Sequence, residues 1–422
     1  MFALVDCNNF YVSCERVFNG KIHHKPVVVL SNNDGCVIAR SNEAKALGIK
    51  MGALAFENED FFTKNNVEVF SSNYALYGDM SDRVMKTIAE MVPDMEVYSI
   101  DEAFIDFHHM PYEDLEALAQ KIRQRVKQYT GIPVSIGIAP TKTLAKVANR
   151  YTKKYLPHIG VYQIDSDHDA EKALVNTSVE DIWGVGYKYA KMLNEHNIYN
   201  ALELTYAKEE WIRQKMHVVG VRMLHELQGT ICYNLDNEPS PKKGICVSRS
   251  FGQSQKDVKV ITEAVATFAA RCGEKLRKQQ SCAHIVHVFL YTNRHRQDQP
   301  QYFNSKVLQL PTSTNSSIEI IRYALRGLEL IFKSGYSYKK AGVMISGIVP
   351  ENQVQIDLFD TRKREIDTKA MKALDELNRR MGRDTVKIAV QGFGRDWHLR
   401  QERKSRCYTT RWQEILEVEA WG

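Results

Sequence analysis

The stretch Tyr98-Ser-Ile-Asp-Glu-Ala-Phe104 (YSIDEAF) places two adjacent carboxylates, Asp101 and Glu102, inside a run of mostly apolar and aromatic residues. Such a run is typical of a strand that crosses a packed core. Two neighbouring carboxylates in a half-buried strand repel each other and resist losing their water. The pair therefore requires either a turn or a cation.

The segments around this stretch alternate between strand and helix patterns. Two amphipathic helices are predicted, over 80–91 and 115–126, because apolar residues recur there at helical spacing. Four apolar runs predict strands: 2–7, 97–101, 103–107 and 134–139. The resulting order, β-α-β-β-α-β, is the ferredoxin-like split unit, and residues 12–78 are largely inserted after its first strand.

In that topology the strand 2–7 and the hairpin 97–107 can lie side by side, so that Asp6 approaches Asp101 and Glu102. Three carboxylates at one sheet edge need cations, and oxygen-only ligands favour Mg²⁺ or Mn²⁺ over zinc. Two such ions, about 3.5–4 Å apart, can activate an attacking oxygen and stabilise a leaving one in phosphoryl transfer. An Asp-Glu pair alone is weak evidence; together with Asp6 it predicts a two-metal site.

The overall composition is that of a folded, multidomain protein. A chain of 422 residues with 44% hydrophobic and 26% charged residues fits about three domains. No apolar run is long enough to span a bilayer, and no export signal is visible at the N-terminus. The eight cysteines are scattered without a C-x-x-C pair, which indicates reduced thiols in a cytoplasmic protein, with neither a disulfide scaffold nor a zinc site. Without an apolar run that could span a bilayer, no membrane contact is expected.

Charge is distributed unevenly along the chain. Residues 1–110 carry 9 Lys/Arg against 16 Asp/Glu, a net charge of −7, whereas residues 111–160 carry 9 against 3. Residues 361–411 carry 15 against 7, a net charge of +8. An acidic stretch followed by basic ones fits a metal site beside a polyanion, although an uneven solvated surface would show the same pattern.

The segment 181–193, DIWGVGYKYAKML, predicts a tight turn at Gly184 and Gly186 that leads into a helix. This is a helix-hairpin-helix pattern, in which backbone N–H groups at a helix start face a DNA phosphate. Lys188 adds a positive charge nearby. Such a contact binds the DNA backbone without reading bases.

Three segments together resemble the palm motifs of the Y-family translesion DNA polymerases: DCNNFY (6–11), YSIDEAF (98–104) and GIAPTKTLAKVAN (137–149). The resemblance covers essentially the whole chain and is closest to the UmuC type, the catalytic subunit of bacterial DNA polymerase V. It implies an α+β, right-hand fold with a ferredoxin-like palm, fingers, a helical thumb that carries the helix-hairpin-helix, and an α/β little finger. The implied boundaries are 1–175 for the palm with fingers inserted at about 12–78, 176–235 for the thumb, 242–349 for the little finger after a polar linker at 236–244, and 350–422 for a basic tail.

The resemblance also implies roles for single residues. Asp6, Asp101 and Glu102 become the catalytic ligands of two Mg²⁺ ions, for which Mn²⁺ could substitute, and Cys7 offers its backbone carbonyl. Phe10 and Tyr11 become nucleotide-binding residues, with Tyr11 as a steric gate that rejects a ribose 2′-hydroxyl.

The remaining nucleotide contacts implied by the resemblance lie further along the chain. Val37 and Ile38 would lie against the nascent base pair, and Lys153 would bind phosphate. The family's fingers motif, Tyr-Glu-Ala-Arg, is replaced here by Asn42-Glu-Ala-Lys45. Lys45 therefore supplies a point charge where the family has a bidentate arginine.

The tail contains the segment Gln355-Ile-Asp-Leu-Phe359, which looks like a peptide that docks on the sliding clamp. Leu358 and Phe359 would enter an apolar pocket and Gln355 would fix the register. Resemblance to the UmuC type further implies a dimer of UmuD′ and RecA as partners, besides primer-template DNA and dNTP, and a location on the nucleoid during the DNA damage response.

The predicted function is error-prone, template-directed addition of dNTPs to a primer 3′-hydroxyl opposite damaged template in the SOS response. Two alternatives remain at this point. A palm-fold nucleotidyl cyclase would share the two-metal chemistry but needs neither the DNA-binding hairpin nor the clamp peptide. A catalytically inactive DNA-binding scaffold would not need the carboxylate trio.

Overall fold

The computed structural model describes residues 1–108, 114–238, 240–355, 360, 364–394 and 397–417. The chain forms two compact units, one made of Met1–Pro239 and Glu402–Gly422 and the other of Ser240–Gln401. The boundary between them falls inside the linker expected at 236–244. In the described part of the chain, every helix is too short or too polar to cross a membrane.

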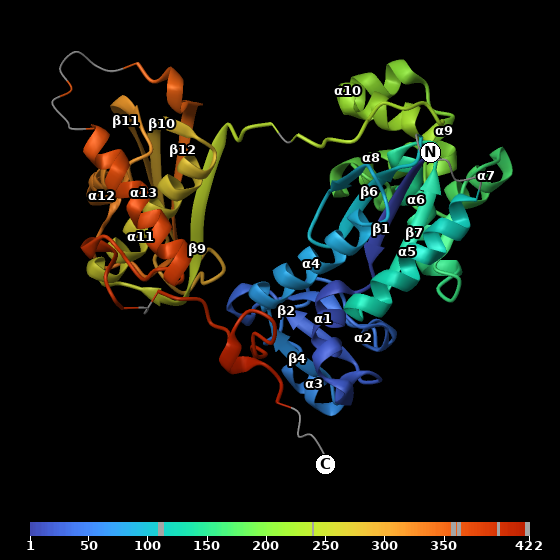
Figure 1. Ribbon diagram of the computed structural model, residues 1–422, viewed down its shortest axis with the longest axis horizontal. Coiled ribbons are helices and arrows are strands. Elements are labelled where there is room, and N and C mark those ends of the chain that lie inside the picture. Colours follow the sequence, from blue (N-terminus) through green and yellow to red (C-terminus); the bar gives the residue numbers. More distant parts are fainter. Residues whose placement is uncertain (109–113, 239, 356–359, 361–363, 395–396, 418–422) are drawn as a thin grey trace. The chain divides into compact units, whose positions relative to one another are not determined.

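The first unit is built on a five-stranded sheet (Figure 1). In spatial order its strands are β5 (Met95–Val97), β6 (Glu102–Asp106), β1 (Phe2–Cys7), β7 (Val134–Ala139) and β8 (Val161–Gln163). The central strand β1 runs antiparallel to both β6 and β7, and β8 is added in parallel to β7. The predicted ferredoxin-like order is therefore confirmed, with one further strand at the edge.

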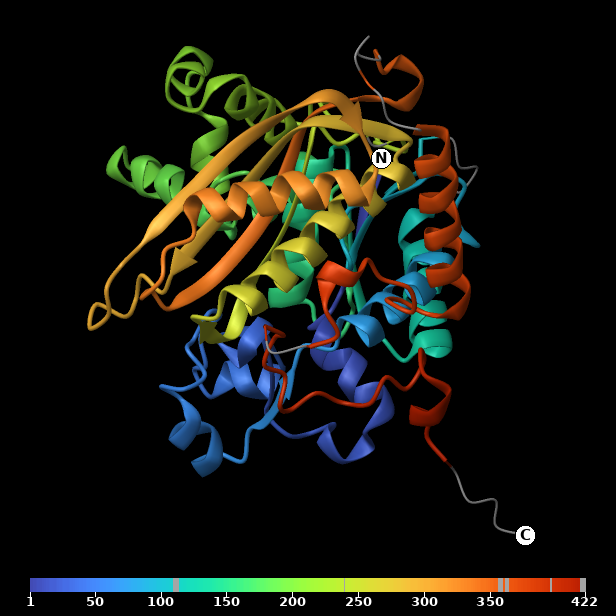
Figure 2. The same cartoon turned by 90° about the vertical axis from the view of Figure 1, so that its left-hand side faces the viewer.

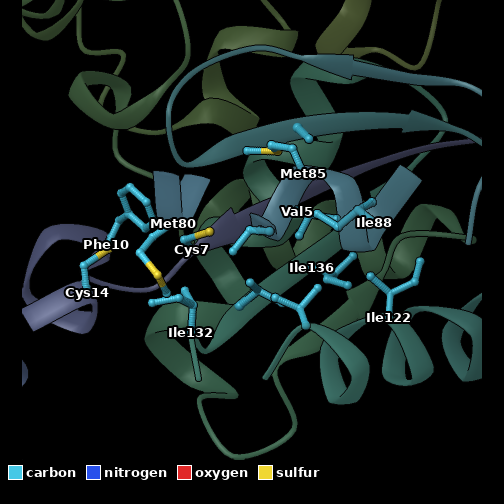
Figure 3. Close-up of a cluster of buried hydrophobic side chains, with 14 of the residues drawn as sticks. Val5, Cys7, Phe10, Cys14, Met80, Met85, Ile88, Ile122, Ile132 and Ile136 are labelled. Atoms are coloured by element: carbon cyan, nitrogen blue, oxygen red, sulfur yellow. The ribbon is translucent and has the colours of Figure 1, made fainter. Parts of the chain in front are cut away.

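Three helices cover the two faces of this sheet: α4 (Tyr74–Ala89), α5 (Leu115–Thr130) and α6 (Lys142–Tyr155). Successive side chains of β1 point to opposite faces of the sheet. Val5 and Cys7 belong to the core that α4 and α5 close, as Figure 3 shows, whereas Leu4 packs in the core on the α6 side. The end of β1 that carries Asp6 is thus fixed by packing on both faces.

A second, three-stranded sheet lies in the segment between β1 and α4. Its spatial order is β3 (Val37–Arg40), β2 (Val27–Leu30) and β4 (Glu68–Ser71), accompanied by α1 (Phe10–Phe18), α2 (Asn42–Ala46) and α3 (Glu59–Lys64). Strand β2 pairs in parallel with β4 and antiparallel with β3, which leaves β4 at one edge of this sheet.

Four helices follow β8: α7 (Asp167–Val175), α8 (Tyr187–Glu195), α9 (Ala201–Thr205) and α10 (Glu209–Leu227). Their apolar side chains share one core with those of α6. In the residues described between 167 and 227, the helices are accompanied by turns, one 3₁₀ segment (Val179–Asp181) and an isolated antiparallel bridge between Ser178 and Asn200.

The second unit has a four-stranded antiparallel sheet packed against two long helices (Figure 1). The strands in spatial order are β11 (Phe303–Thr314), β10 (Ser281–Thr292), β12 (Tyr338–Pro350) and β9 (Gly244–Gln255), and the helices are α11 (Val258–Lys278) and α12 (Ser317–Ile331). A third helix, α13 (Arg364–Met381), follows the strands, and Arg277 of α11 pairs with its Asp375. From Glu402 onward the chain belongs to the first unit again.

One predicted strand is wrong. The sequence pattern predicts a strand over 97–101, but β5 ends at Val97 and β6 begins at Glu102. Residues 98–101 form the turn between the two strands instead. The hydroxyl of Ser99 is the reason, because it accepts hydrogen bonds from the backbone of Asp101 and Glu102.

Candidate active site

The turn between β5 and β6 is organised by the side chain of Ser99. Its Oγ accepts hydrogen bonds from the backbone N–H groups of Asp101 (3.2 Å) and Glu102 (3.1 Å), and it donates one to Asp101 Oδ1 (2.6 Å). These bonds compete with strand pairing, as serine hydroxyls do in turns. The turn therefore separates Asp101 from the strand, and only Glu102 lies in β6.

Strand register brings Asp6 to the same place. The Cα atom of Asp6 in β1 is paired with that of Glu102 in β6. One residue on, the backbone N–H of Cys7 donates to the carbonyl oxygen of Asp101 at 2.9 Å. Three acidic residues from two distant parts of the chain therefore meet at one end of the sheet, as the topology predicted.

Two lysines of α6 form ion pairs with two of these carboxylates. Lys153 Nζ lies 2.5 Å from Asp6 Oδ1, and Lys146 Nζ lies 3.0 Å from both carboxylate oxygens of Glu102. Burial still raises the pKa of Asp6 to about 6, and the nearby charges of Glu102 and Asp101 add to the shift, whereas Lys153 opposes it. The carboxylates are therefore only partly compensated by the protein itself.

The chemistry of this site fits a hard divalent cation. Among the described residues, no group of three His, Cys, Asp or Glu side chains is arranged to hold a metal ion. Asp6 and Glu102 each pair with a lysine instead. The donors that meet here are nevertheless oxygen atoms alone, which Mg²⁺ and Mn²⁺ prefer. The raised pKa of Asp6 indicates a place where additional positive charge would be favourable.

Tyr11 is held on two sides by aromatic rings of α4. Its ring stacks on that of Tyr77, with centroids 4.5 Å apart and an interplanar angle of 15°, and the ring of Tyr74 meets it edge-on at 6.0 Å. The Tyr11 ring is only half-buried, so part of it faces solvent. Phe10, by contrast, is 3% exposed and packs in the core. Its ring lies beside that of Tyr11 inside the core and is not exposed at the surface of the site.

A cluster of polar and cationic groups lies next to Asp6, around Asn9. The side chain of Asn9 donates from Nδ2 to Asn42 Oδ1 (3.0 Å) and accepts from Lys45 Nζ at its Oδ1 (2.6 Å). Burial lowers the pKa of Lys45, and the neighbouring charges of Arg40 and Lys153 lower it further. These cations repel one another, so the cluster is suited to an anion with several charges, such as a triphosphate.

Strand β3 carries both residues that were predicted to contact the nascent base pair, and the two differ in exposure. Alternation along the strand buries Val37 completely among the side chains of α2 and α3, whereas Ile38 stays partly exposed. Only Ile38 can therefore contact a nucleotide directly.

Sequence reasoning missed three residues of this site: Asn9, Arg40 and Lys146. Asn9 adopts the left-handed conformation (φ 47°), which asparagine tolerates better than most residues. Arg40 donates to the Ile49 carbonyl, and its Nε is buried without a hydrogen-bond partner among the described residues. A signal existed only for Asn9 and Lys146, because both lie inside the quoted palm motifs.

The helix-hairpin-helix segment has the local geometry expected of it. Gly184 has a positive φ of 93°, which favours glycine, and Gly186 precedes the first turn of α8 without a side-chain cap. A Cβ atom at Gly186 would meet no heavy atom within 4 Å, and Lys188 is exposed. The N–H groups of this helix start are therefore accessible to an anion.

The predicted clamp peptide is only partly described. Gln355 is exposed, whereas Leu358 and Phe359 lie outside the described residues.

Comparison with known proteins identifies the family to which this chain belongs. Residues 5–150 match the impB/mucB/samB family, and residues 242–358 match the C-terminal domain of that family. Protein UmuC of Salmonella typhimurium is 42% identical over 422 residues, covering 99% of this chain and 100% of the relative. Protein ImpB of Salmonella typhimurium is 42% identical over 419 residues, covering 98% and 99%. The chain belongs to the impB/mucB/samB family.

Members of the impB/mucB/samB family of the UmuC type are Y-family translesion DNA polymerases, so the resemblance seen in the palm motifs is confirmed, and with it the DNA-directed DNA polymerase activity. Family membership also implies dependence on divalent metal ions and binding of DNA and dNTP. Residues 368–418 match a domain of unknown function (DUF4113).

Solved structures agree on the fold. A chimera of the Y-family DNA polymerases Dbh and Dpo4 aligns with a TM-score of 0.64 at 22% identity, covering 83% of this chain and 100% of the chimera. An insertion ternary complex of Dbh DNA polymerase aligns with a TM-score of 0.57 at 21% identity and the same coverage. The predicted right-hand, α+β architecture is confirmed.

Proposed function

We propose that this impB/mucB/samB family polymerase carries its catalytic centre where β1 meets β6, at Asp6, Asp101 and Glu102. There the primer 3′-hydroxyl attacks the α-phosphorus of a dNTP and pyrophosphate leaves. The observation that carries the proposal is the pairing of Asp6 with Glu102 across β1 and β6, fixed by the Cys7–Asp101 backbone hydrogen bond of 2.9 Å.

The metal ligands proposed are these three carboxylates and the backbone carbonyl of Cys7, which together would hold two Mg²⁺ ions, or Mn²⁺ in their place. Divalent ions bound there supply charge stabilisation for the attacking and leaving oxygens of the transfer. The protein's own contribution is to keep the carboxylates convergent through strand register and the Ser99 turn. Lys153 would release Asp6 and turn towards phosphate when the site is loaded.

The incoming nucleotide would bind between the Asn9 cluster and Tyr11. Lys45, Arg40 and Asn42 would contact the triphosphate, since they already gather around Asn9 with uncompensated positive charge. Tyr11 would reject a ribose because its ring is backed by Tyr77 and leaves no room for movement away from the sugar. Ile38 would lie against the nascent base pair, with Val37 beneath it.

The domain boundaries proposed for this polymerase follow the sequence: palm 1–175 with fingers at about 12–78, thumb 176–235, little finger 242–349 and tail 350–422. The thumb would hold the DNA backbone through Gly184, Gly186 and Lys188, since the helix start there is open. Within the tail, residues 402–417 belong to the same compact unit as the palm and fingers.

The partners proposed are primer-template DNA, a UmuD′ dimer, RecA and the sliding clamp. The last would take the peptide Gln355–Phe359, and the exposure of Gln355 is compatible with docking. A location on the nucleoid in the cytoplasm during the DNA damage response belongs to the same proposal. The cyclase and the inactive scaffold gain no support from the comparisons.

Primer extension across an abasic site tests the catalytic assignment, with and without UmuD′, RecA and the clamp. Asp101→Ala and Glu102→Ala should abolish extension, while DNA binding measured by fluorescence anisotropy stays close to that of the native chain. Glu116→Ala, which removes an exposed carboxylate on α5, is the matched control. Extension by either variant at near-native rates would refute the metal assignment.

A further inference from the structure

The segment from Glu402 to Glu414 crosses back onto the first unit and lies beside α1 and β4, as the red trace in Figures 1 and 2 shows. It belongs to the part of the chain that matches the domain of unknown function. Its contacts are made with the palm and fingers elements, and they end next to the ring that backs Tyr11.

The segment first extends the small sheet at its open edge. Lys404 forms a parallel bridge with Ser71 of β4. The backbone N–H of Ser71 donates to the Arg403 carbonyl (2.9 Å), and the Arg403 N–H donates to Ser71 Oγ (2.9 Å). Arg403 also pairs with Glu59 of α3 at 3.0 Å. The tail thereby satisfies backbone groups at the end of an edge strand.

The segment next attaches to the start of α4 through Asn73. Asn73 caps this helix, since its Oδ1 accepts from the Leu76 N–H, and its Nδ2 lies 3.0 Å from Ser405 Oγ, 3.2 Å from the Ser405 carbonyl and 3.1 Å from the Arg406 carbonyl. Asn73 is completely buried under this contact, and Cys407 is 1% exposed. The tail is therefore packed into the first unit at this point and does not merely lie on its surface.

Ser405 also reaches the buried carboxylate of Glu15 in α1. Ser405 Oγ and the Tyr77 hydroxyl both donate to Glu15 Oε1, at 3.0 Å and 2.6 Å. Glu15 is 1% exposed and Tyr77 is fully buried. A buried carboxylate that loses one of its donors is costly, so the two donors and the acceptor hold each other in place.

This network continues into the proposed sugar gate. The phenol ring whose hydroxyl binds Glu15 is the ring on which Tyr11 stacks, 4.5 Å away at 15°. A contact that fixes the hydroxyl of Tyr77 also fixes the plane of its ring. The order of contacts is therefore Ser405, Glu15, Tyr77 and Tyr11, from the tail to the sugar site.

We infer that the C-terminal segment 402–408 helps this polymerase select the sugar of its nucleotide, with Ser405, Glu15 and Tyr77 acting as positioning residues for Tyr11. The inference rests on the proposed gate role of Tyr11. A steric gate works only if its ring is held in place, because a Tyr11 ring that could tilt would admit a ribose. The tail supplies one of the two donors to the Glu15 carboxylate, which in turn accepts from the hydroxyl of the backing ring. This gives the segment a role in specificity.

Single-nucleotide insertion with a dNTP and the matching rNTP tests the inference, using the ratio of the two kcat/KM values in the full chain with its partners. Tyr77→Phe removes the hydroxyl and keeps the ring, and Ser405→Ala removes the tail donor. Each should lower the deoxyribose preference by about five- to tenfold, the effect of losing one buried hydrogen bond. Ser405→Thr keeps a hydroxyl and should retain the preference.

The ratio separates positioning from stability, because a loss of folded protein lowers both rates by the same factor. Thr410→Ala removes an exposed hydroxyl from the same tail and should change nothing. Tyr11→Ala reports on the gate itself, and an unchanged ratio there refutes the gate and the inference together. If Tyr11→Ala lowers the ratio while Ser405→Ala does not, the gate stands and the role of the tail is refuted, whatever the result for Tyr77→Phe.

Discussion

Lys153 Nζ lies 2.5 Å from the Oδ1 atom of Asp6. The two residues come from opposite ends of the palm sequence, and Lys153 supplies the positive charge that a carboxylate beside Asp101 and Glu102 requires. A lysine and a metal ion offer Asp6 the same compensation. This relationship makes the response of the protein to divalent ions measurable without any catalysis.

Lys153→Met should make folding depend on divalent metal. Without magnesium, the variant leaves Asp6 uncompensated and should lose about 1–3 kcal/mol of unfolding free energy, less than a fully buried pair because Lys153 is 34% exposed. Added Mg²⁺ should then raise the melting temperature more in the variant than in the native chain. Differential scanning fluorimetry with and without EDTA measures this. Lys154→Met, the neighbouring exposed lysine, should behave like the native chain.

Ser99→Ala should loosen the turn that carries Asp101. The variant loses an acceptor for two backbone N–H groups and a donor to Asp101 Oδ1. We expect primer extension to slow about tenfold and the unfolding free energy to drop by about 1 kcal/mol, with unchanged affinity for primer-template DNA. Ser99→Thr keeps the hydroxyl and should restore extension. Equal rates for the Ala variant and the native chain would show that Ser99 does not organise the site.

Lys45→Ala should weaken the hold on the triphosphate. Lys45 is fixed by Asn9 at 2.6 Å and faces the cluster that Arg40 completes. The KM for dNTP in steady-state insertion should rise about tenfold, which corresponds to the loss of one charge-assisted contact, while kcat changes less. Lys50→Ala removes an exposed lysine of the same fingers region and serves as the control. A fall in kcat at constant KM would contradict a binding role.

Glu15→Gln should change how stability depends on pH. Burial raises the pKa of Glu15 above its usual 4.5, although the hydrogen bonds from Tyr77 and Ser405 oppose the shift. The folded chain therefore binds a proton more tightly than the unfolded chain does, and the stability that this provides is lost as the pH rises through the raised pKa.

Relative to the Gln variant, the native chain should lose up to about 1.4 kcal/mol for each pH unit between 4.5 and the raised pKa. Urea unfolding of both chains at several pH values measures the difference. A difference that grows with pH in favour of the native chain would show that the folded state lowers this pKa.

The sheet was predictable because its determinants are local. The alternating apolar residues of 2–7 and 134–139, and the helical spacing over 115–126, assign each element from neighbouring residues alone, and the order of elements then places Asp6 beside Glu102. The 97–101 segment failed for a local reason as well. Its apolar composition resembles a strand, but the Ser99 hydroxyl binds the backbone two and three residues on and turns the chain.

The surroundings of the carboxylates were less predictable. The sequence placed Phe10 and Val37 at the nucleotide, yet both are buried, because which face of a helix or strand is covered depends on what packs against it. Arg40 carried no distinguishing pattern, and Lys146 was marked only by its position inside the palm motif at 137–149. They gain their place from the approach of β3 to the Asn9 cluster and of α6 to β6.

The sequence by itself determined the order of strands and helices, the acidic residues that meet at the end of β1 and the family to which this polymerase belongs, since each is written in short motifs or in periodicity. The tertiary structure alone decided that Lys153 and Lys146 hold those carboxylates and that Ser405 touches Glu15. Those contacts join residues that are 147, 44 and 390 positions apart. Only the packing of the folded chain brings such residues together.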